Sequence, residues 1–269
     1  PGSSFKPITG AIGLDAGTLD PDRDYGEEGL SWQKDESWGN YHVTTLHNTN
    51  PATLEHAMVL SDNIYFAKAA LETGYDAFAS GLDRLGFNQD LPFEISVAKS
   101  QYSNTDQIET EIQLADSGYG QGQVLVNPIH LASLYTMYPN RGKVLKPYLV
   151  YKDTPEPEVW IEDACSPETA EIVEDGMKAV ISSEHGTGHA AMRSDITLAG
   201  KTGTAEIKAS KEDTSGTELG WFAVYTAEKD IQKPVLMVSM VEDVKNAGGS
   251  GLVVRKSRDV LGAYIPSGQ

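Results

Sequence analysis

The chain has 269 residues, of which 39% are hydrophobic, and it carries a formal net charge of -18 at pH 7. This composition is typical of an ordinary globular protein, and the negative charge argues against a nucleic-acid partner, because such binding depends on neutralising phosphates. A single cysteine, Cys165, excludes an internal disulfide and any cysteine-based metal site.

The first six residues, Pro1-Gly2-Ser3-Ser4-Phe5-Lys6, contain a possible nucleophile with its own base. Ser3 and Lys6 are three residues apart, which places both side chains on one face of a helix. A lysine kept neutral by burial or by a nearby cation can take the serine proton, so Ser3 is expected to form an acyl-enzyme. Pro7 fits only the first turn of a helix, which predicts Ser3 at a helix N-terminus. Because the pair is common by chance, a solvated first turn without chemistry is the alternative.

Residues 8–14 continue this helix with an apolar stripe, which predicts that it is buried. Residues 20–50 are polar and rich in glycine, aspartate and tryptophan, and they predict a long structured loop. Trp32, Trp38 and Tyr41 either rim a cleft or pack this loop onto the body, and packing is the preferred interpretation.

Two helices are predicted at 54–60 and 64–72, with Thr53 as an N-cap and Gly74 as a stop. The Ser61-Asp62-Asn63 segment between them consists of residues that favour caps and turns. It either presents polar side chains into a cleft or serves only as a helix-helix turn.

A short helix is expected at 76–85, followed by an irregular polar region to residue 118. Glycines in the 117–123 segment allow its backbone to approach a ligand or another segment closely. Asn-Pro and Ser-Pro pairs cap and begin two core helices, predicted at 128–138 and 167–181.

His185 and His189 are four residues apart, but the glycines between them disfavour a helix and no third ligand is near. The sequence therefore predicts no metal site and no cofactor. A flexible glycine-rich loop before a strand is the preferred interpretation.

Three strands are predicted at 197–207, 219–226 and 234–241, the last two as an antiparallel hairpin joined around residues 228–230. A final helix is expected at 252–264. Helices in the middle and strands late in the chain indicate an α+β (mixed α/β) fold with one antiparallel sheet flanked by helices.

Three motifs together suggest one catalytic site: Ser3-x-x-Lys6, Ser61-Asp62-Asn63 and Lys201-Thr202-Gly203. In this hypothesis Ser3 attacks a carbonyl and Lys6 accepts its proton. Ser61 relays that proton to the leaving amine, and Asn63 holds the substrate amide.

The strand motif supplies the binding groups of the hypothesis. Lys201 adds positive potential, while Thr202 and Thr204 offer hydroxyls to a substrate carboxylate. Gly203 allows the substrate backbone to pair with the strand edge. The backbone N–H groups of Ser3 and Thr204 are predicted to form the oxyanion hole.

This motif set is shared by penicillin-binding proteins and class A β-lactamases. The whole chain resembles the transpeptidase domain of class B penicillin-binding proteins, especially the low-affinity type associated with methicillin resistance. Four stretches carry the resemblance: 32–39, 60–67, 114–122 and 200–206.

The resemblance implies a serine β-lactamase/transpeptidase-like fold and a peptidoglycan stem peptide ending in D-Ala-D-Ala as substrate. It implies that the products are a cross-link and free D-Ala, that β-lactams acylate Ser3, and that Gln121 and Glu206 line the cleft. The expected location is the extracytoplasmic face of the bacterial cell membrane, with the membrane anchor outside this chain.

Residues 1–269 are expected to form one transpeptidase domain that is incomplete at its N-terminus. In the family, further strands, a non-catalytic domain and a membrane anchor precede the nucleophile helix. Three strands without those neighbours are expected to leave a sheet edge open. The missing part is then either on another chain or omitted.

Four alternatives stay open. A β-lactamase needs a carboxylate to activate water, and the nearest candidate, Glu94, lacks the Glu-x-x-Leu-Asn setting and is better explained as a surface charge. A D,D-carboxypeptidase differs only in using water as the acyl acceptor. A non-catalytic β-lactam sensor binds covalently without turnover. A purely structural domain requires that the three motifs be scattered in space.

Overall fold

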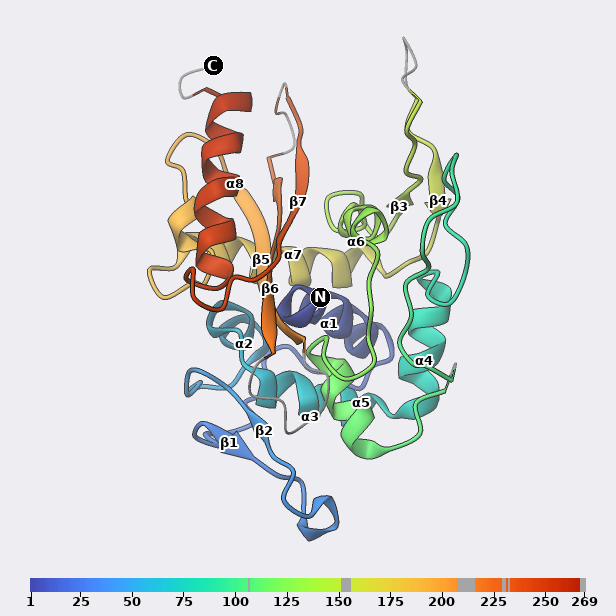
Figure 1. Cartoon of the computed structure of the whole chain (residues 1–269), viewed down its shortest axis with the longest axis vertical. Helices are drawn as coiled ribbons and strands as arrows, with labels where there is room; N and C mark the ends of the chain where they lie inside the picture. Colours follow the sequence, from blue (N-terminus) through green and yellow to red (C-terminus); the bar gives the residue numbers. More distant parts are fainter. Residues whose placement is uncertain (106, 151–155, 208–215, 229–230, 232, 267–269) are drawn as a thin grey trace.

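The structure is a computed structural model that describes residues 1–105, 107–150, 156–207, 216–228, 231 and 233–266. Its central element is a three-stranded antiparallel sheet, with strand order β5-β6-β7 (Figure 1). The strands are β5 (Leu198–Ile207), β6 (Thr217–Thr226) and β7 (Leu236–Val241). The predicted α+β fold and the antiparallel pairing of the last two strands are confirmed. Lys229 and Asp230, assigned to the hairpin turn, lie outside the described residues.

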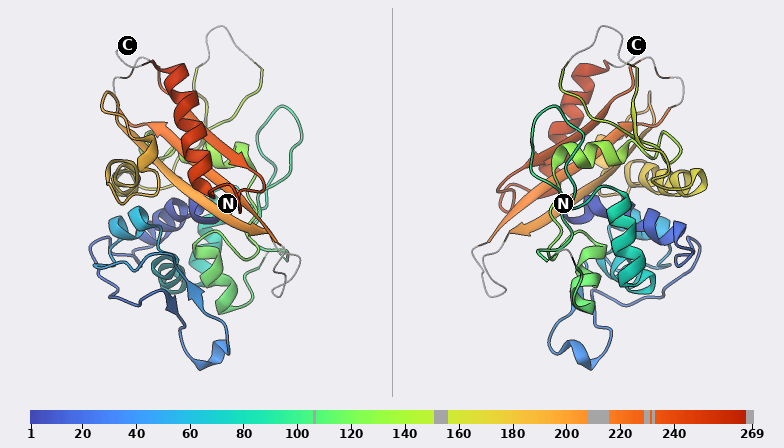
Figure 2. Two further views of the ribbon diagram at one scale, coloured as in Figure 1. Left: turned by 60° about the vertical axis from the view of Figure 1, so that its left-hand side comes forward. Right: turned by 90° about the vertical axis from the view of Figure 1, so that its right-hand side faces the viewer.

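Strand β6 explains why the sheet is covered on both faces. Successive side chains of a strand point to opposite faces, and its Gly-Trp-Phe-Ala-Val-Tyr run is apolar at every position. Trp221 and Tyr225 join the main core, whereas Phe222 and Val224 pack with residues of α8 (Ser250–Tyr264). Figure 2 shows α8 crossing one face of the sheet, with the other helices beyond it.

The N-terminal segment lies at the centre of the molecule, at the junction of the sheet and the helices (Figure 1). A 3-10 turn, η1 (Gly2–Phe5), leads into α1 (Lys6–Asp15), which has Pro7 in its first turn. Ile8 and Ala11 are almost completely buried, so the prediction of a buried helix that begins near Ser3 is confirmed. Helix α1 packs against α2 (Leu54–Leu60), α3 (Asn63–Thr73), α4 (Tyr75–Arg84) and α7 (Pro167–Ser182).

The remaining elements are short and lie around this centre. They are β1 (Ser31–Trp32), η2 (Glu36–Trp38), β2 (Val43–Thr44), α5 (Glu111–Gly118), α6 (Pro128–Tyr135), β3 (Val144–Leu145), β4 (Val159–Ile161) and η3 (His189–Ala191). In the described part of the chain, no helix combines the length and apolarity needed to cross a bilayer.

The structure differs from the sequence prediction in two helices. Helix α5 lies in a region predicted to be irregular, although Thr110 caps it by accepting a hydrogen bond from the backbone N–H of Gln113. Helix α6 ends at Tyr135 instead of residue 138, because the Thr136 hydroxyl binds the Ser133 carbonyl and the N–H of Leu145. These two bonds turn the chain toward β3 (Val144–Leu145).

The long loop is organised by its aromatic residues. Trp32 and Trp38 meet edge to face, and Tyr41 lies against Trp38. Trp38 is 5% exposed, and the other two rings pack partly buried against the core. The preferred interpretation, that these rings fix the loop to the body, agrees with this packing.

Two glycines bring the N-terminal turn against its neighbours. Gly120 has φ +76°, and a Cβ built there would lie 2.2 Å from the carbonyl oxygen of Gly2. The N–H of Gly2 donates to the carbonyl of Gly120 at 3.0 Å. At Gly203 of β5, a Cβ would lie 2.4 Å from the carbonyl oxygen of Pro1. The turn that carries Ser3 therefore lies directly against both backbones.

We expect Gly120→Ala to destabilise the protein far more than Gly17→Ala. Gly17 also has positive φ, at +67°, but a Cβ there would meet nothing within 4 Å. The control should therefore show only the cost of a left-handed alanine, about 1 to 2 kcal/mol. Urea unfolding of both variants measures the difference, and equal losses would mean that the turn tolerates displacement.

Candidate active site

A cavity of about 140 Å³ opens at the edge of β5, where the sheet meets the helices. Its lining comes from segments distant in sequence: Ser3, Leu46, His47, Leu60, Ser61, Asn63, Tyr119, Gln121, Thr187, Thr202, Gly203, Thr204 and Ser250. Seven of the predicted site residues are in this set, and the structural-domain alternative, which needs scattered motifs, does not agree with it. Glu206 is exposed and does not line the cavity, so the structure does not bring it to the cleft.

Lys6 lies directly beneath this cavity and is completely buried. Its Nζ donates to the Ser61 carbonyl at 2.7 Å and to Asn63 Oδ1 at 2.7 Å, and it lies 3.2 Å from Ser61 Oγ. Burial, and then the charge of Lys201, hold the pKa of Lys6 well below its ordinary value, while Asp62 acts in the opposite direction. The lowered pKa favours the neutral amine, which is the form that can act as a base.

Lys201 reaches the same hydroxyl from the opposite side. It is completely buried on β5, and its Nζ lies 2.9 Å from Ser61 Oγ. Burial lowers the pKa of Lys201 to about 7. Ser61 Oγ therefore lies within hydrogen-bond distance of two amines, and the charge of Lys201 disfavours protonation of Lys6. This arrangement suits the transfer of one proton through the hydroxyl.

The backbone around Ser61 explains how its hydroxyl is held there. Ser61 ends α2 in the left-handed conformation, with φ 58° and ψ 48°. Asp62 then caps α3 by accepting from the N–H groups of Ile64 at 2.8 Å and Tyr65 at 3.3 Å. A strained non-glycine residue with a rigid cap on one side is typical of a functional turn.

Ser3 is half-buried in its 3-10 turn, and no hydrogen bond from its hydroxyl to another described residue is present. Residues three apart lie one above the other in such a turn, so Ser3 and Lys6 share a face. The Gly2 position touches the Thr204 carbonyl, where a Cβ would lie 2.3 Å away. The oxyanion hole formed by the backbone N–H groups of Ser3 and Thr204 stays a prediction. The two segments that carry these groups are in contact.

Strand β5 supplies three lining residues in succession, Thr202, Gly203 and Thr204. Thr202 is 3% exposed and its Oγ1 donates to Thr187 Oγ1 at 2.7 Å. Gln121 Nε2 donates to the Thr204 carbonyl at 3.4 Å, which connects the glycine-rich 117–123 segment to the strand.

Sequence reasoning missed several residues of the cavity wall, among them Tyr119 and Thr187. The hydroxyls of Tyr119 and Tyr41 both donate to Asp116, which fixes the Tyr119 ring at the cavity. Tyr119 lies in the glycine-rich 117–123 segment, and those glycines are the sequence signal that could have identified it. Thr187 lies between His185 and His189, in the segment that the sequence predicts to be a flexible glycine-rich loop.

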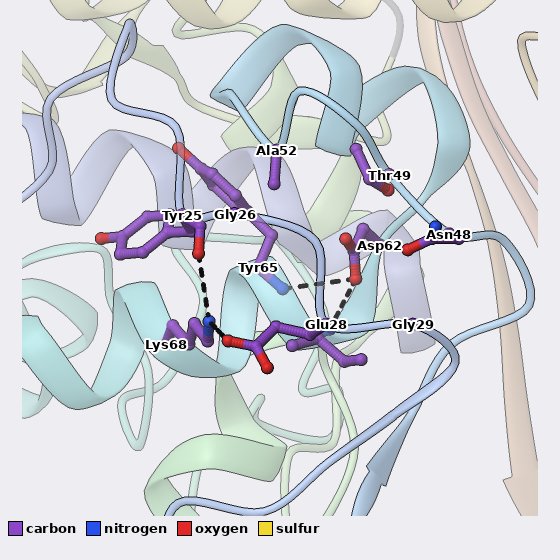
Figure 3. A pocket seen from close by; sticks show the side chains of 11 residues that line it. Tyr25, Gly26, Glu28, Gly29, Asn48, Thr49, Ala52, Asp62, Tyr65 and Lys68 are labelled. Atoms are coloured by element: carbon purple, nitrogen blue, oxygen red, sulfur yellow. Dashed lines mark hydrogen bonds and ion pairs between the residues drawn. The ribbon is translucent and has the colours of Figure 1, made fainter.

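A second pocket, shown in Figure 3, lies behind the start of α3. Lys68 crosses it to pair with Glu28 and to donate to the Tyr25 carbonyl. Its volume is about 10 Å³, which holds no more than one water molecule. Asp62 is among the residues that line this pocket, which is too small for a substrate.

No group of three or more His, Cys, Asp or Glu side chains in the described ranges is arranged to hold a metal ion. His189, one of the two histidines considered above, has its Nδ1 3.1 Å from the Ile181 carbonyl.

An antiparallel sheet edge that meets a serine turn and two buried lysines defines the class of penicillin-recognising serine proteins. The sequence model of one family within that class, described as penicillin binding protein transpeptidase domain, matches residues 1–261. The chain belongs to this family.

Two curated relatives have related sequences. Penicillin-binding protein 3 of Bacillus subtilis is 44% identical over 96% of the chain and 38% of its own length. The peptidoglycan D,D-transpeptidase MrdA of Haemophilus influenzae is 25% identical over 98% of the chain and 44% of its own length. The chain thus spans less than half of either relative.

Solved structures share the fold. The D,D-transpeptidase domain of a peptidoglycan glycosyltransferase from Eggerthella lenta matches 98% of the chain and 64% of that structure, with a TM-score of 0.79 and 25% identity. PBP2 of Pseudomonas aeruginosa in complex with WCK 5153 matches 100% of the chain and 61% of that structure, with a TM-score of 0.79 and 23% identity. The comparisons confirm the predicted fold class.

We expect the rate of Ser3 acylation by a fluorescent penicillin to rise with pH through neutrality, as the proton leaves the lysine pair. Lys201→Met removes the positive charge that lowers the pKa of Lys6. The pKa of Lys6 then rises, so the rising limb should shift to higher pH, with a rate loss of about 100-fold or more. Pre-steady-state labelling across pH measures both effects.

Lys99→Met is the control, because the Lys99 side chain is half exposed and pairs only with Asp90 in the described part of the chain. Its pH profile should match wild type. An unshifted profile in Lys201→Met would show that the two amines do not interact.

Proposed function

We propose that this chain is the catalytic part of a peptidoglycan D,D-transpeptidase that works through an acyl-enzyme on Ser3. The observation that carries the proposal is the Ser61 hydroxyl, held 3.2 Å from the Lys6 amine and 2.9 Å from the Lys201 amine at the wall of the cavity. Family membership and the names of the relatives support the same activity.

In the acylation step, Ser3 Oγ attacks the carbonyl between the two D-Ala residues of a stem peptide. Its proton passes to the neutral Lys6 amine, and the N–H groups of Ser3 and Thr204 stabilise the oxyanion. The C–N bond then breaks, and Ser61 gives its proton to the departing D-Ala amine while it regains one from the lysine pair.

In the second step, the amine of another stem peptide attacks the ester carbonyl of the acyl-enzyme. Its proton returns through Ser61 and the lysine pair, and the Ser3 oxygen leaves and is protonated again. The products are a cross-link and the free enzyme. A β-lactam follows the first step, but its amine stays attached to the acyl group and blocks the second.

Substrate positioning is assigned to groups around the same cavity. We propose that Asn63 and Gln121 hold the substrate amides, that Gly203 lets its backbone lie along the β5 edge, and that Thr202 and Thr204 serve the carboxylate. The Asn63 amide is itself oriented, because Oδ1 accepts from Lys6 and Nδ2 donates to the Thr44 carbonyl at 2.8 Å. Glu206 remains a proposed substrate contact with weaker support, since it is exposed outside the cavity.

The β-lactamase alternative has little support in the cavity. Glu94 is exposed and accepts from the N–H groups of Leu149 at 2.9 Å and Val150 at 3.5 Å. These bonds hold the pKa of Glu94 below its usual range, and Glu94 does not line the cavity. The carboxypeptidase and the non-catalytic sensor both keep the same acylation step and are separated by the fate of the adduct.

Three finer statements belong to the proposal. The low-affinity type associated with methicillin resistance is supported by stretches 60–67 and 114–122, and rapid acylation by benzylpenicillin would contradict it.

The extracytoplasmic location follows from where stem peptides occur, and labelling of intact cells by an impermeant penicillin tests it. A single domain over 1–269 is supported by α1 and the sheet sharing one core, and limited proteolysis tests it.

We expect Ser3→Ala to abolish covalent labelling by a fluorescent penicillin, because it removes the oxygen that forms the ester. Ser4→Ala is the matched control, since the Ser4 hydroxyl faces away from Lys6 and donates to the Pro1 carbonyl at 2.8 Å. The control should keep its labelling and lose about 1 kcal/mol of stability. Mass spectrometry of the digested adduct locates the ester, and labelling of Ser3→Ala would refute the assignment.

The fate of the acyl group separates the remaining alternatives. With a stem-peptide donor and an amine acceptor, a transpeptidase should release D-Ala and form the cross-linked product. A carboxypeptidase releases D-Ala and forms only the hydrolysed peptide, and a sensor accumulates a stable adduct without turnover. A penicilloyl adduct that hydrolyses within seconds would identify a β-lactamase.

A further inference from the structure

Two side chains near the end of the long loop lie at the mouth of the active-site cavity. Leu46 and His47 both line the cavity, and both are exposed. Leu46 is 88% exposed, more than any other large hydrophobic side chain that the structure describes. A side chain that lines a cavity and also faces solvent lies where a second reactant can enter. None of the three sequence motifs includes these two residues.

The backbone just before this pair is attached to the turn that carries Asn63. The Thr44 carbonyl accepts a hydrogen bond from Asn63 Nδ2 at 2.8 Å, and Thr45 Oγ1 accepts one from the Asn63 N–H at 3.4 Å. Thr45 is itself buried. Leu46 and His47 follow directly, so their place beside the catalytic turn is set before a ligand arrives, which limits the entropy lost on binding.

The His47 imidazole is the one basic side chain among the described residues that line the cavity. No hydrogen bond or ion pair joins this imidazole to another residue in the described ranges. A neutral imidazole accepts a proton at one ring nitrogen, and an exposed imidazole can pass that proton on to water. The side chain is therefore able to act on a reactant at the mouth of the cavity.

The second step of the proposed reaction needs a base at this position. An aliphatic primary amine is an ammonium ion near neutral pH, and it must lose one proton before its nitrogen can attack. Lys6 and Lys201 lie buried beneath the cavity, and a protonated amine there repels an incoming ammonium. No carboxylate is among the described residues of the lining to hold such a cation. The proton is therefore best removed at the mouth, where the imidazole lies.

We propose that Leu46 and His47 form the acceptor site of the second step, which takes a primary amine carried on an aliphatic chain. This inference rests on the proposed function and refines it. Leu46 contacts the methylene chain, and the His47 imidazole takes one proton from the ammonium group and passes it to water. The amine nitrogen then bonds to the ester carbonyl carbon, and its second proton passes through Ser61. The bond from that carbon to Ser3 Oγ breaks, and Oγ regains a proton.

The test starts from an acyl-enzyme formed with a D-Ala-D-Ala peptide and compares two acceptors of equal length. Pentylamine is charged near neutral pH, whereas O-butylhydroxylamine carries an uncharged NH₂ group. His47→Gln should slow aminolysis by pentylamine about 100-fold and leave aminolysis by O-butylhydroxylamine at the wild-type rate. Leu46→Ala should raise the half-saturating concentration of both acceptors about 3- to 10-fold. Mass spectrometry of the amide and hydrolysed products over time measures both effects.

His42→Gln is the matched control, because His42 is exposed on the same long loop and does not line the cavity. It should react like wild type with both acceptors, and thermal unfolding of all variants checks folding. An equal slowing of both acceptors in His47→Gln would overturn the inference, as would an unchanged rate with pentylamine or a wild-type acyl-enzyme that neither acceptor consumes. Failure of wild type to form any acyl-enzyme on Ser3 would instead refute the proposed function itself.

Discussion

The two buried amines of Lys6 and Lys201, brought to opposite sides of the Ser61 hydroxyl, set the main constraint on this structure. Burying a charged lysine amine is unfavourable, and two charged amines close together repel each other. Both effects favour the neutral form of the amine. The protein holds both because polar groups of a strained turn, among them the Ser61 carbonyl and Asn63 Oδ1, accept hydrogen bonds from Lys6. The result is a pair of buried lysines whose lowered pKa values favour the neutral amine.

Keeping this arrangement requires three parts of the fold to meet without gaps. The N-terminal turn lies against β5 at Gly203 and against the 117–123 segment at Gly120, with contacts too close for any side chain. The α2–α3 junction is fixed by the Asp62 cap. Residues of α1, α3, α7 and the sheet share one core, so a shift of one part would disturb the other two.

The same architecture separates the chemistry from the binding of substrate. The amines lie beneath the cavity, where burial controls their protonation, while hydroxyls and amides line its wall. In the proposed function, the edge of β5 offers backbone groups to an extended peptide, and Ser61 and Asn63, at the ends of α2 and α3, face the same cavity. The protein as a whole is acidic, with a net charge of -18, and a protonated Lys201 brings a positive charge to the β5 edge.

The sequence by itself determined the local structure and the identity of the reactive groups. Pro7 marked a helix start, the segments 219–226 and 234–241 marked two antiparallel strands, and three short motifs named Ser3, Lys6, Ser61 and Lys201. Only the tertiary structure decided how these groups meet, because Lys201 and Ser61 are 140 positions apart and no local pattern encodes their contact. Thr187 lines the cavity and Glu206 does not, and residue type does not decide this. The packing of a loop and the course of a strand edge determine which side chains face the cleft.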